Sequence, residues 1–424
     1  MPEFITSYGD KIPFVEGYRD LFGRQHTPTE TLARPDRETP PIPFSAFVKD
    51  RYLYGTVVDL LAQTGIAPPF GRVMELGAGE ATFSRLLRGS GKAKQAVAVD
   101  IQHRDEALPT ALFNKYQSRF RRQRWFSKLL RSRMRGPRRL EPSIGRGGGA
   151  GEAASPGAAA SRGGVSAKVA RLPFARKAID FYRRMGSEIS RPFGGQGYYP
   201  GSDSEYFTVA AERSAQYDAY RRDNVYEMSD RYDTIFAVLC LEYFNSEEIF
   251  TKVSELLDDG GSFIVLVNSW WYPRNATEIA GNFPWASQRL TREDTERYFR
   301  EFHPDEAAST MELYDYFTPE HPTIRDYSDT GMRHGLTPIV MHPLMSPQYR
   351  DGRAVATPML LAELEDTNLH DVLNHIHQFR PDVSAMDLMT KFYFMVFRRQ
   401  PREMPRFADA TAALGITART GDDD

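Results

Sequence analysis

The sequence has very little cysteine and no long apolar run. Its 424 residues contain one cysteine, Cys240, so no disulfide can form within the chain and a reducing compartment is its natural setting. A membrane span requires roughly 18 apolar residues, whereas the longest apolar runs, TIFAVLCL and SFIVLV, have the length of buried strands. The first residues, MPEFITSYGDKIPF, contain acids and no long apolar core, so we expect no secretory signal there. These features predict a cytoplasmic protein.

Charge is unevenly distributed, although the whole chain carries a net charge of only −2. Residues 104–191 contain 21 lysines and arginines against 6 aspartates and glutamates, a net charge of +15. The rest of the chain therefore carries about −17. Within the basic part, GRGGGAGEAASPGAAASRGG at 145–164 has too few apolar residues to form a core, and we predict that it is disordered.

Short apolar strands alternate with amphipathic helices outside the basic part. A helix is predicted over 45–63, followed by the strand RVMEL, a helix over 81–88 and the strand QAVAVDI, which ends at Asp100. The alternation resumes at YDAYRRDN and continues through YDTIFAVLCLEYF, a helix capped by Ser246 and the strand SFIVLVNSWW. GLTPIVMHPL and KFYFMVFRR are late strands. Strands separated by helices predict an α/β protein with a mostly parallel sheet.

We predict one large domain over 44–400 that is interrupted by two insertions. The first is the basic insertion at 104–205. The second, at 272–330, is dense in aromatic residues and is expected to form a helical lid or cap over a small organic substrate. An N-terminal arm, 1–43, precedes the domain, and a C-terminal tail, 401–424, follows it.

The stretch RVMELGAGEATFSRLL is the strongest indication of a ligand. Gly77 and Gly79 let the backbone approach a ligand at the start of a helix, where backbone amides are free. No Gly-Lys-Ser/Thr follows, which excludes a P-loop, and Thr82 stands where a dinucleotide fingerprint has its third glycine. Glu75 would repel a pyrophosphate but suits a ligand that carries an ammonium group.

Two further acids lie at the ends of predicted strands. Asp100, 21 residues after Gly79, is placed to accept both hydroxyls of a ribose. Asp223 ends the third strand, where a carboxylate can accept an adenine amino proton and the next backbone amide can reach the adenine ring. A cationic amino acid, a ribose and an adenine together make up S-adenosylmethionine.

In this order, VMELGAGEATFS, AVAVD, RRDN, YDTIFAVLCLEYF and LLDDGGSFIVLVNSWW resemble the successive motifs of class I S-adenosylmethionine-dependent methyltransferases. The fourth motif is most similar to the small-molecule branch, although its final histidine is Tyr243 here and the third glycine of the first motif is Ala81. The resemblance covers 71–101 and 217–271. It implies a Rossmann-like seven-stranded sheet with a reversed last strand, helices on both faces, and methyl transfer to a small organic acceptor.

The resemblance also assigns cofactor-binding residues. It assigns Glu75, Gly77, Ala78 and Gly79 to the methionine part, Asp100 and Ile101 to the ribose, and Asp223 and Asn224 to the adenine. Leu239, at the end of the fourth strand, completes the set. The fourth strand is followed by Leu-Cys-Leu rather than by Asn/Asp-Pro-Pro-Tyr, which argues against nucleic-acid bases as acceptors.

The sequence leaves the catalytic base open. Side chains at strand ends and in the later part of the chain are candidates: His103, Glu242, Tyr243, Asn268, His303, His321 and His334. Of these, Glu242, Tyr243 and His103 are weak candidates for direct catalysis. No group of histidines, cysteines and acids has metal-ligand spacing, so we expect metal-independent transfer. The acceptor atom, whether oxygen, nitrogen or carbon, does not follow from the sequence.

The basic insertion has three interpretations. In its first part, 104–135, arginines are interleaved with aromatic residues on a helical stripe. In the first, it lies on an anionic membrane surface, which would suit an enzyme for a lipid or quinone-like substrate. In the second, it binds RNA phosphates. In the third, it folds back on the acidic remainder of the chain as a flap. The charge of about −17 on the remainder favours the flap, and nucleic acid is not expected as a partner. A module that binds the cofactor without transferring its methyl group is a further alternative.

Overall fold

The structure is a computed structural model. It describes residues 2–19, 44–101, 111–116, 118–119, 217–273, 279–317, 320–344, 349–350, 353–354 and 368–401. Nearly all of the basic insertion lies outside the described residues, and so do the predicted disordered stretch at 145–164 and the C-terminal tail beyond Pro401.

The described residues belong to two compact units. The smaller unit contains the start of α2 up to Lys49 and the helical residues 111–116, and in it the rings of Phe47 and Phe113 meet edge to face at 5.1 Å between centroids. The larger unit contains the sheet, the cap and the N-terminal residues, and is described below.

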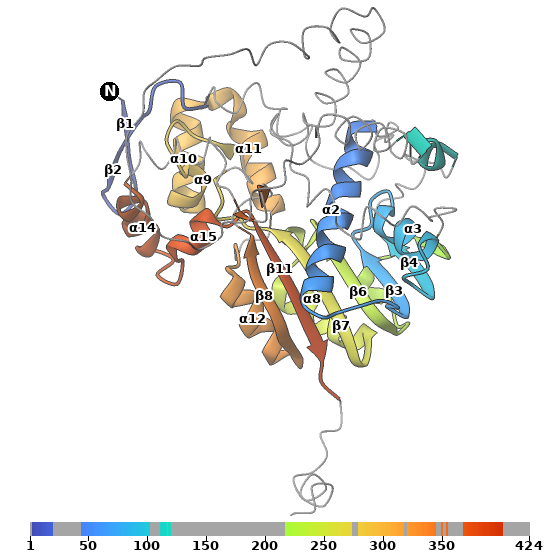
Figure 1. Cartoon of the computed structure of the whole chain (residues 1–424). Helices are drawn as coiled ribbons and strands as arrows, with labels where there is room; N and C mark the ends of the chain where they lie inside the picture. The colour runs from blue at the N-terminus through green and yellow to red at the C-terminus, as the bar shows by residue number, and fades with distance from the viewer. Residues whose placement is uncertain are drawn as a thin grey trace, which may run out of the picture. The chain divides into compact units, whose positions relative to one another are not determined.

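A seven-stranded sheet forms the centre of the larger unit (Figure 1). Its strands, in spatial order, are β5 (Ala219–Arg221), β4 (Gln95–Val99), β3 (Arg72–Leu76), β6 (Tyr232–Val238), β7 (Leu257–Asn268), β11 (Phe392–Arg399) and β8 (Leu336–Leu344). Neighbouring strands from β5 to β7 are parallel, whereas β11 runs antiparallel to both β7 and β8. The predicted mostly parallel sheet with a reversed last strand is therefore confirmed.

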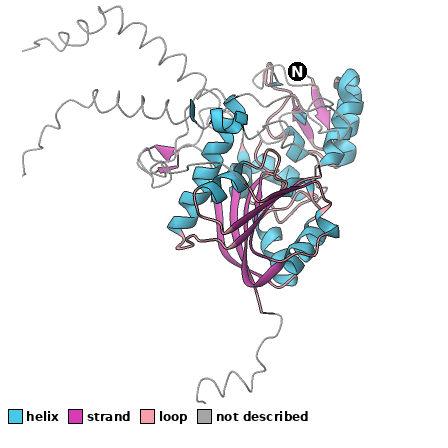
Figure 2. Ribbon diagram, turned by 90° about the vertical axis from the view of Figure 1, so that its right-hand side faces the viewer, coloured by secondary structure: helices cyan, strands magenta, loops and turns pink. Residues whose placement is uncertain are grey.

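Helices cover both faces of this sheet (Figure 2). Those that flank it are α2 (Phe44–Gln63) from Asp50 onward, α3 (Thr82–Gly89), α8 (Ser246–Leu256) and α12 (Ile324–Arg333). Successive side chains of a strand point to opposite faces. Met74 of β3 joins a core cluster with Phe250 of α8 and Tyr327 of α12, whereas its neighbour Glu75 contacts α3 on the opposite face. There, the ring of Tyr54 in α2 meets that of Phe83 in α3.

The N-terminus of α8 differs from the prediction. Its N-cap is Asn245, whose side-chain oxygen accepts a hydrogen bond from the Glu248 amide at 3.0 Å, so the prediction of Ser246 as the cap is wrong by one residue. The helix ends at Leu256, because the residues from Leu257 onward, including the two glycines, already belong to β7.

The predicted end of the second insertion, residue 330, lies within α12, which packs on the core of the sheet. Residues 279–317 form a helical group with buried aromatic side chains, which we call the cap. Its described helices are α9 (Ala286–Arg289), α10 (Arg292–Phe302) and α11 (Pro304–Tyr316), and later α14 (Leu369–His377) and α15 (Ala385–Met389) join them. A hairpin of β1 (Glu3–Ile5) and β2 (Lys11–Pro13) adds Phe4 and Ile12 to the core of the cap. A separate two-stranded sheet pairs β9 (Tyr349–Arg350) with β10 (Arg353–Ala354).

Candidate functional site

The turn between β3 and α3 is built from backbone in the left-handed region. Gly77 and Gly79 have φ of 61° and 51°, and Ala81, which precedes α3, has a φ of 56°. A left-handed conformation costs a residue with a Cβ roughly 1–2 kcal/mol. Ala81, which stands where the methyltransferase motif that the sequence resembles has its third glycine, therefore has a glycine-like conformation, although its side chain is a methyl group.

Gly77 is also required by a close contact. A Cβ built on it would lie 2.5 Å from the Cβ and 2.8 Å from the Sγ of Cys240, at the end of β6. The buried thiol of Cys240 donates a hydrogen bond to the Leu76 carbonyl at 3.1 Å. The end of β6 thus packs directly on the turn, and the lone cysteine of the chain has a structural place there.

Glu75 is buried beneath the same turn, 4% exposed. Its two carboxylate oxygens accept hydrogen bonds from the amides of Phe83, at 3.3 Å, and Ser84, at 2.7 Å. Burial raises the pKa of Glu75 from 4.5 to about 7, against the opposing effect of these amides and of Arg85. The carboxylate holds the start of α3, and its remaining lone pairs are the ones available to a ligand.

Asp100 ties the turn to the end of β4. Its Oδ2 accepts a hydrogen bond from the Gly79 amide at 2.9 Å. On the other side, the Tyr220 hydroxyl donates to the Gly79 carbonyl at 2.7 Å. Gly79 is therefore held from both sides by residues of the next two strands, while a Cβ built on it would meet nothing within 4 Å. The sequence does not reveal that Tyr220 holds the glycine turn, because nothing in the residues around it indicates its hydrogen bond to Gly79.

The predicted ribose and adenine residues follow β4 and β5 at the same edge of the sheet. Ile101 is 59% exposed, and Asp223 and Asn224 are exposed as well. The Asn224 side chain accepts a hydrogen bond from the Tyr226 amide at 3.2 Å and begins a short 3-10 helix, Val225–Glu227. These residues line an open surface beside the glycine turn.

The ends of β6 and β7 bring two polar side chains together. Leu239 has a φ of 55° and turns the chain out of the sheet into a 3-10 turn, Leu241–Tyr243. In that turn the Glu242 carboxylate, 8% exposed, accepts a hydrogen bond from the Asn268 side-chain amide at 2.6 Å. His103, the third weak candidate, lies outside the described residues.

The three later histidines differ in their surroundings. Both ring nitrogens of His303 are engaged, by Arg19 and Asn282, and those of His334 are engaged by Thr251 and Glu247. These two histidines therefore serve the structure.

His321 is different, because its buried Nε2 has no hydrogen-bond partner in the described part of the chain. Its ring stacks on that of Trp270, at 3.7 Å between centroids and 1° between planes. It also has a left-handed backbone, with a φ of 42°. Burial, together with the nearby charge of Arg380, lowers the pKa of His321 to about 3, so the ring is neutral.

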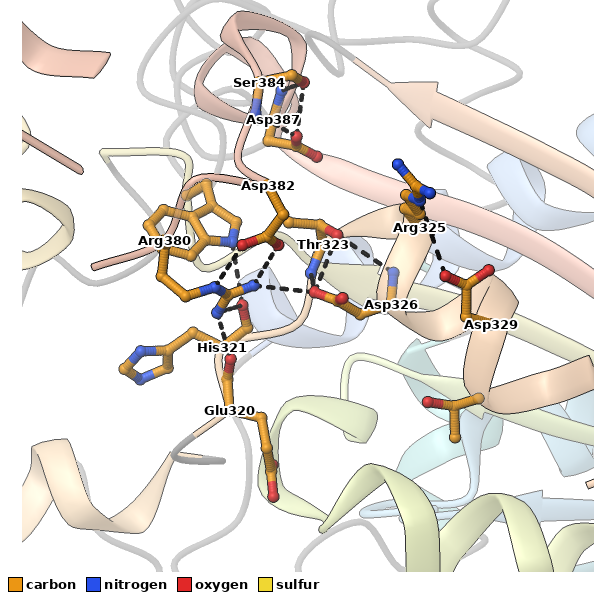
Figure 3. A network of polar contacts seen from close by, with 12 residues as sticks. Glu320, His321, Thr323, Arg325, Asp326, Asp329, Arg380, Asp382, Ser384 and Asp387 are labelled. Carbon is orange, nitrogen blue, oxygen red and sulfur yellow. Dashed lines mark hydrogen bonds and ion pairs between the residues drawn. The ribbon is translucent and has the colours of Figure 1, made fainter. Parts of the chain in front are cut away.

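Arg380 fixes the backbone at His321, as Figure 3 shows. Its guanidinium donates to the carbonyls of Glu320 and His321, at 2.6 and 3.2 Å, and binds the carboxylates of Asp326 and Asp382. It also lies over the Trp271 ring, 5.1 Å from the centroid. The sequence analysis did not single out Arg380, since it follows α14 and is distant in sequence from every motif.

No family model matches this chain, and no curated protein sequence matches it. Solved methyltransferase structures match it at low identity. Magnesium protoporphyrin IX methyltransferase from Synechocystis is 8% identical over 83% of this chain and 84% of its own, with a TM-score of 0.33. Geranyl diphosphate C-methyltransferase from Streptomyces coelicolor is 12% identical over 87% of this chain and 91% of its own, with a TM-score of 0.33. Both structures contain S-adenosylhomocysteine.

The order and direction of the strands agree with the fold that the sequence motifs imply. The reversed β11 lies between β7 and β8, helices cover both faces, and a glycine turn follows β3. The chain has the class I methyltransferase fold. In the described part of this fold, no three acidic, histidine or cysteine side chains gather as a metal site would require. Within the same residues, no helix combines the length and apolar character of a membrane span.

Proposed function

We propose that this protein transfers a methyl group from S-adenosylmethionine to a small organic acceptor without a metal ion. The observation that carries the proposal is the clamped glycine turn, in which Asp100 and Tyr220 hold Gly79 at the carboxyl edge of the parallel strands. Ligands of open α/β sheets bind at this edge, beside the point where the strand order reverses. Here the order reverses at β3, from which the turn begins.

The residues present suit the three parts of this cofactor. Asp100 lies beside the turn, where its carboxylate accepts from the Gly79 amide, and a carboxylate is the type of acceptor that ribose hydroxyls require. The space beside Gly79 is open, since a Cβ there would have no neighbour within 4 Å. Glu75 offers negative charge near the turn for an amino group. The residues that would hold the cofactor are those assigned from the motifs: Glu75, Gly77, Ala78, Gly79, Asp100, Ile101, Asp223, Asn224 and Leu239.

When bound, the cofactor supplies an electrophilic methyl group on a sulfonium. The chain has to orient the acceptor, exclude water and remove a proton. Glu242 is the residue that we assign to proton removal, because its carboxylate lies at the end of β6, two residues beyond the cysteine that packs on Gly77. Asn268, from the neighbouring strand, orients this carboxylate through its 2.6 Å hydrogen bond.

A nicotinamide dinucleotide fits this turn less well. Thr82, buried at the first position of α3, stands where a dinucleotide site has glycine to let the pyrophosphate and helix approach. A buried Glu75 carboxylate would add repulsion toward two phosphates in a partly desolvated site.

A melting assay tests the proposal. S-adenosylhomocysteine at about 100 times its Kd should stabilise the protein by about 2.7 kcal/mol through mass action, and NAD and NADP at equal concentration should not. Asp100→Ala should weaken the affinity for S-adenosylhomocysteine by roughly 1.5–3 kcal/mol, because hydrogen bonds to a charged acceptor are lost. Stabilisation by NAD alone would overturn the proposal. Isotope transfer from labelled cofactor to a metabolite extract then distinguishes an enzyme from a module that only binds the cofactor.

A membrane-surface enzyme for a lipid or quinone-like substrate is a second candidate. The net charge of +15 over residues 104–191 supports it, since basic segments are attracted to anionic lipids. We retain as proposals a cytoplasmic location and peripheral membrane contact through this insertion. Flotation of the full chain with anionic but not with neutral vesicles is the expected result if the insertion binds membranes.

A further inference from the structure

Aromatic rings form a partly exposed surface beyond the ends of β6 and β7. Tyr243 and Tyr316 are 45% and 39% exposed, although large aromatic side chains are usually mostly buried. Phe317 and Trp270 adjoin them. We call these four rings the aromatic ledge.

The rings of the ledge contact one another in sequence. Tyr243 stacks on Phe317, with 5.5 Å between centroids and 22° between planes, and lies 5.1 Å from Tyr316. Phe317 in turn meets the indole of Trp270 at 5.6 Å. Tyr243, Tyr316 and Phe317 therefore make a stepped, partly exposed surface, with the buried Trp270 behind it.

Neutral aromatic rings back the ledge. His321 stacks flat on Trp270, and Tyr314 meets both of these rings edge to face. Because the pKa of His321 is lowered to about 3, the ring that stacks on Trp270 is neutral near neutral pH. The Trp271 indole and Arg380 both donate to the His321 carbonyl, which fixes the backbone of this histidine. Figure 3 shows the contact of Arg380.

The ledge begins at the candidate cofactor turn. The Tyr243 amide donates to the Cys240 carbonyl at 3.2 Å, and the Cys240 side chain packs on Gly77. Glu242, the residue before Tyr243, accepts from Asn268. One short 3-10 turn therefore connects the glycine turn, a buried carboxylate and an exposed aromatic ring.

We propose that the aromatic ledge is the acceptor subsite and that it takes a planar aromatic molecule bearing a hydroxyl group. The proposal rests on the methyl-transfer function proposed above. The acceptor ring lies against Tyr243 and Phe317, and its hydroxyl group faces Glu242. The hydroxyl proton passes to the Glu242 carboxylate, and the oxygen forms a bond to the methyl carbon. The carbon–sulfur bond breaks with both electrons left on the sulfur, which turns the sulfonium into a neutral thioether.

The geometry of the rings favours a flat aromatic ligand over other small molecules. Offset stacking adds to the favourable burial of an aromatic ring, and an aliphatic ring of the same size gains burial alone. A quaternary ammonium ligand is instead recognised by ring faces that surround it, whereas the ledge rings are in contact with one another.

The test uses 2-naphthol as a probe with the full chain. Titration calorimetry is performed on protein saturated with S-adenosylhomocysteine, with cyclohexanol and choline as comparison ligands. Tyr243→Ala should weaken 2-naphthol binding about tenfold, and Tyr243→Phe should restore it to within about twofold of the native value. Tyr8→Ala is the matched control, because Tyr8 is also half exposed, at 51%, and also stacks on a phenylalanine, Phe379, but on the N-terminal hairpin. It should change nothing.

Transfer of a labelled methyl group to 2-naphthol gives the second measurement. Tyr243→Ala should raise KM about tenfold with little change in kcat, and Glu242→Gln should lower kcat and remove its dependence on a basic group in the pH profile.

Several results would overturn the subsite. They are a native protein that binds S-adenosylhomocysteine but not 2-naphthol, equal binding of cyclohexanol or choline, and equal effects of the Tyr243→Ala and Tyr8→Ala variants. Failure of the proposed function appears differently, as the absence of any melting shift with S-adenosylhomocysteine, and it is observed before any acceptor is added.

Discussion

At the carboxyl edge of the sheet, the half around β3 and β4 and the half around β6 and β7 are built from different kinds of chemical group. Around β3 and β4 the candidate cofactor site consists of backbone in left-handed conformations and two carboxylates, Glu75 and Asp100. Around β6 and β7 the candidate acceptor site consists of side-chain rings stacked on one another, backed by His321. The first half is suited to one polar ligand of defined shape, and the second to a flat apolar one.

The buried titratable groups of the two halves respond oppositely to burial. Desolvation raises the pKa of Glu75 to about 7 and lowers that of His321 to about 3, because in both groups it disfavours the charged form. In each half, burial therefore shifts an ionisable side chain toward its neutral form. The free energy of unfolding should therefore fall as the pH drops in the case of His321 and as the pH rises in the case of Glu75, and both changes can be measured.

The largest expected effect concerns His321. Its pKa is about 3 in the folded protein and 6.5 in the unfolded chain. Between these two pH values the unfolded chain therefore binds more protons than the native one. The contribution of His321 to the free energy of unfolding should fall as the pH drops through this interval, by up to about 1.4 kcal/mol per pH unit. His321→Phe, which keeps a ring on Trp270, should flatten the measured slope between pH 3.5 and 6.5 by about that amount. His370→Phe, at an exposed position of α14, is the control, and an equal slope in the two variants would contradict the prediction.

For Glu75 we expect a change in stability of opposite sign, and a smaller total change because the interval between its two pKa values is narrower. Its folded pKa of about 7 lies above 4.5, so the native state binds more protons in this interval. Stability contributed by the protonated form should be lost as the pH rises from 4.5 to 7, by up to about 1.4 kcal/mol per pH unit. Glu75→Gln should remove this loss, as urea unfolding at several pH values can show. A loss that persists in the variant would mean that burial does not control this carboxyl group.

The smallest effect is a difference of about 1–3 kcal/mol between two variants of the glycine turn, which separates the contact of a side chain from backbone conformation. Gly77→Ala places a Cβ 2.5 Å from that of Cys240 and should cost about 2–4 kcal/mol of stability. Gly79→Ala has a similar φ but open space around it, and should cost only about 1 kcal/mol. Thermal unfolding measures both. Adding Cys240→Gly to Gly77→Ala should recover most of the difference, and equal costs for the two single variants would show that strain, not the contact, sets the requirement for glycine.

Much of the polar half could be predicted because its signals are local. The glycines, Glu75 and Asp100 lie at the ends of strands that the apolar pattern marks clearly, and parallel strands bring those ends to one edge. The strand RVMEL agrees with β3 residue for residue. The cap of α8 was predicted one residue late, because serine and asparagine can both cap and only the backbone decides which of them does.

The sequence by itself determined the alternation of strands and helices, the glycine turn after β3 and the density of aromatic residues over 272–330, since each follows from neighbouring residues. Only the tertiary structure decided the contacts between distant residues. It placed Cys240 against Gly77, engaged Glu75 with the start of α3, and stacked His321 on Trp270. Such contacts depend on how the sheet and the cap pack, and packing joins residues whose separation along the chain carries no periodic signal.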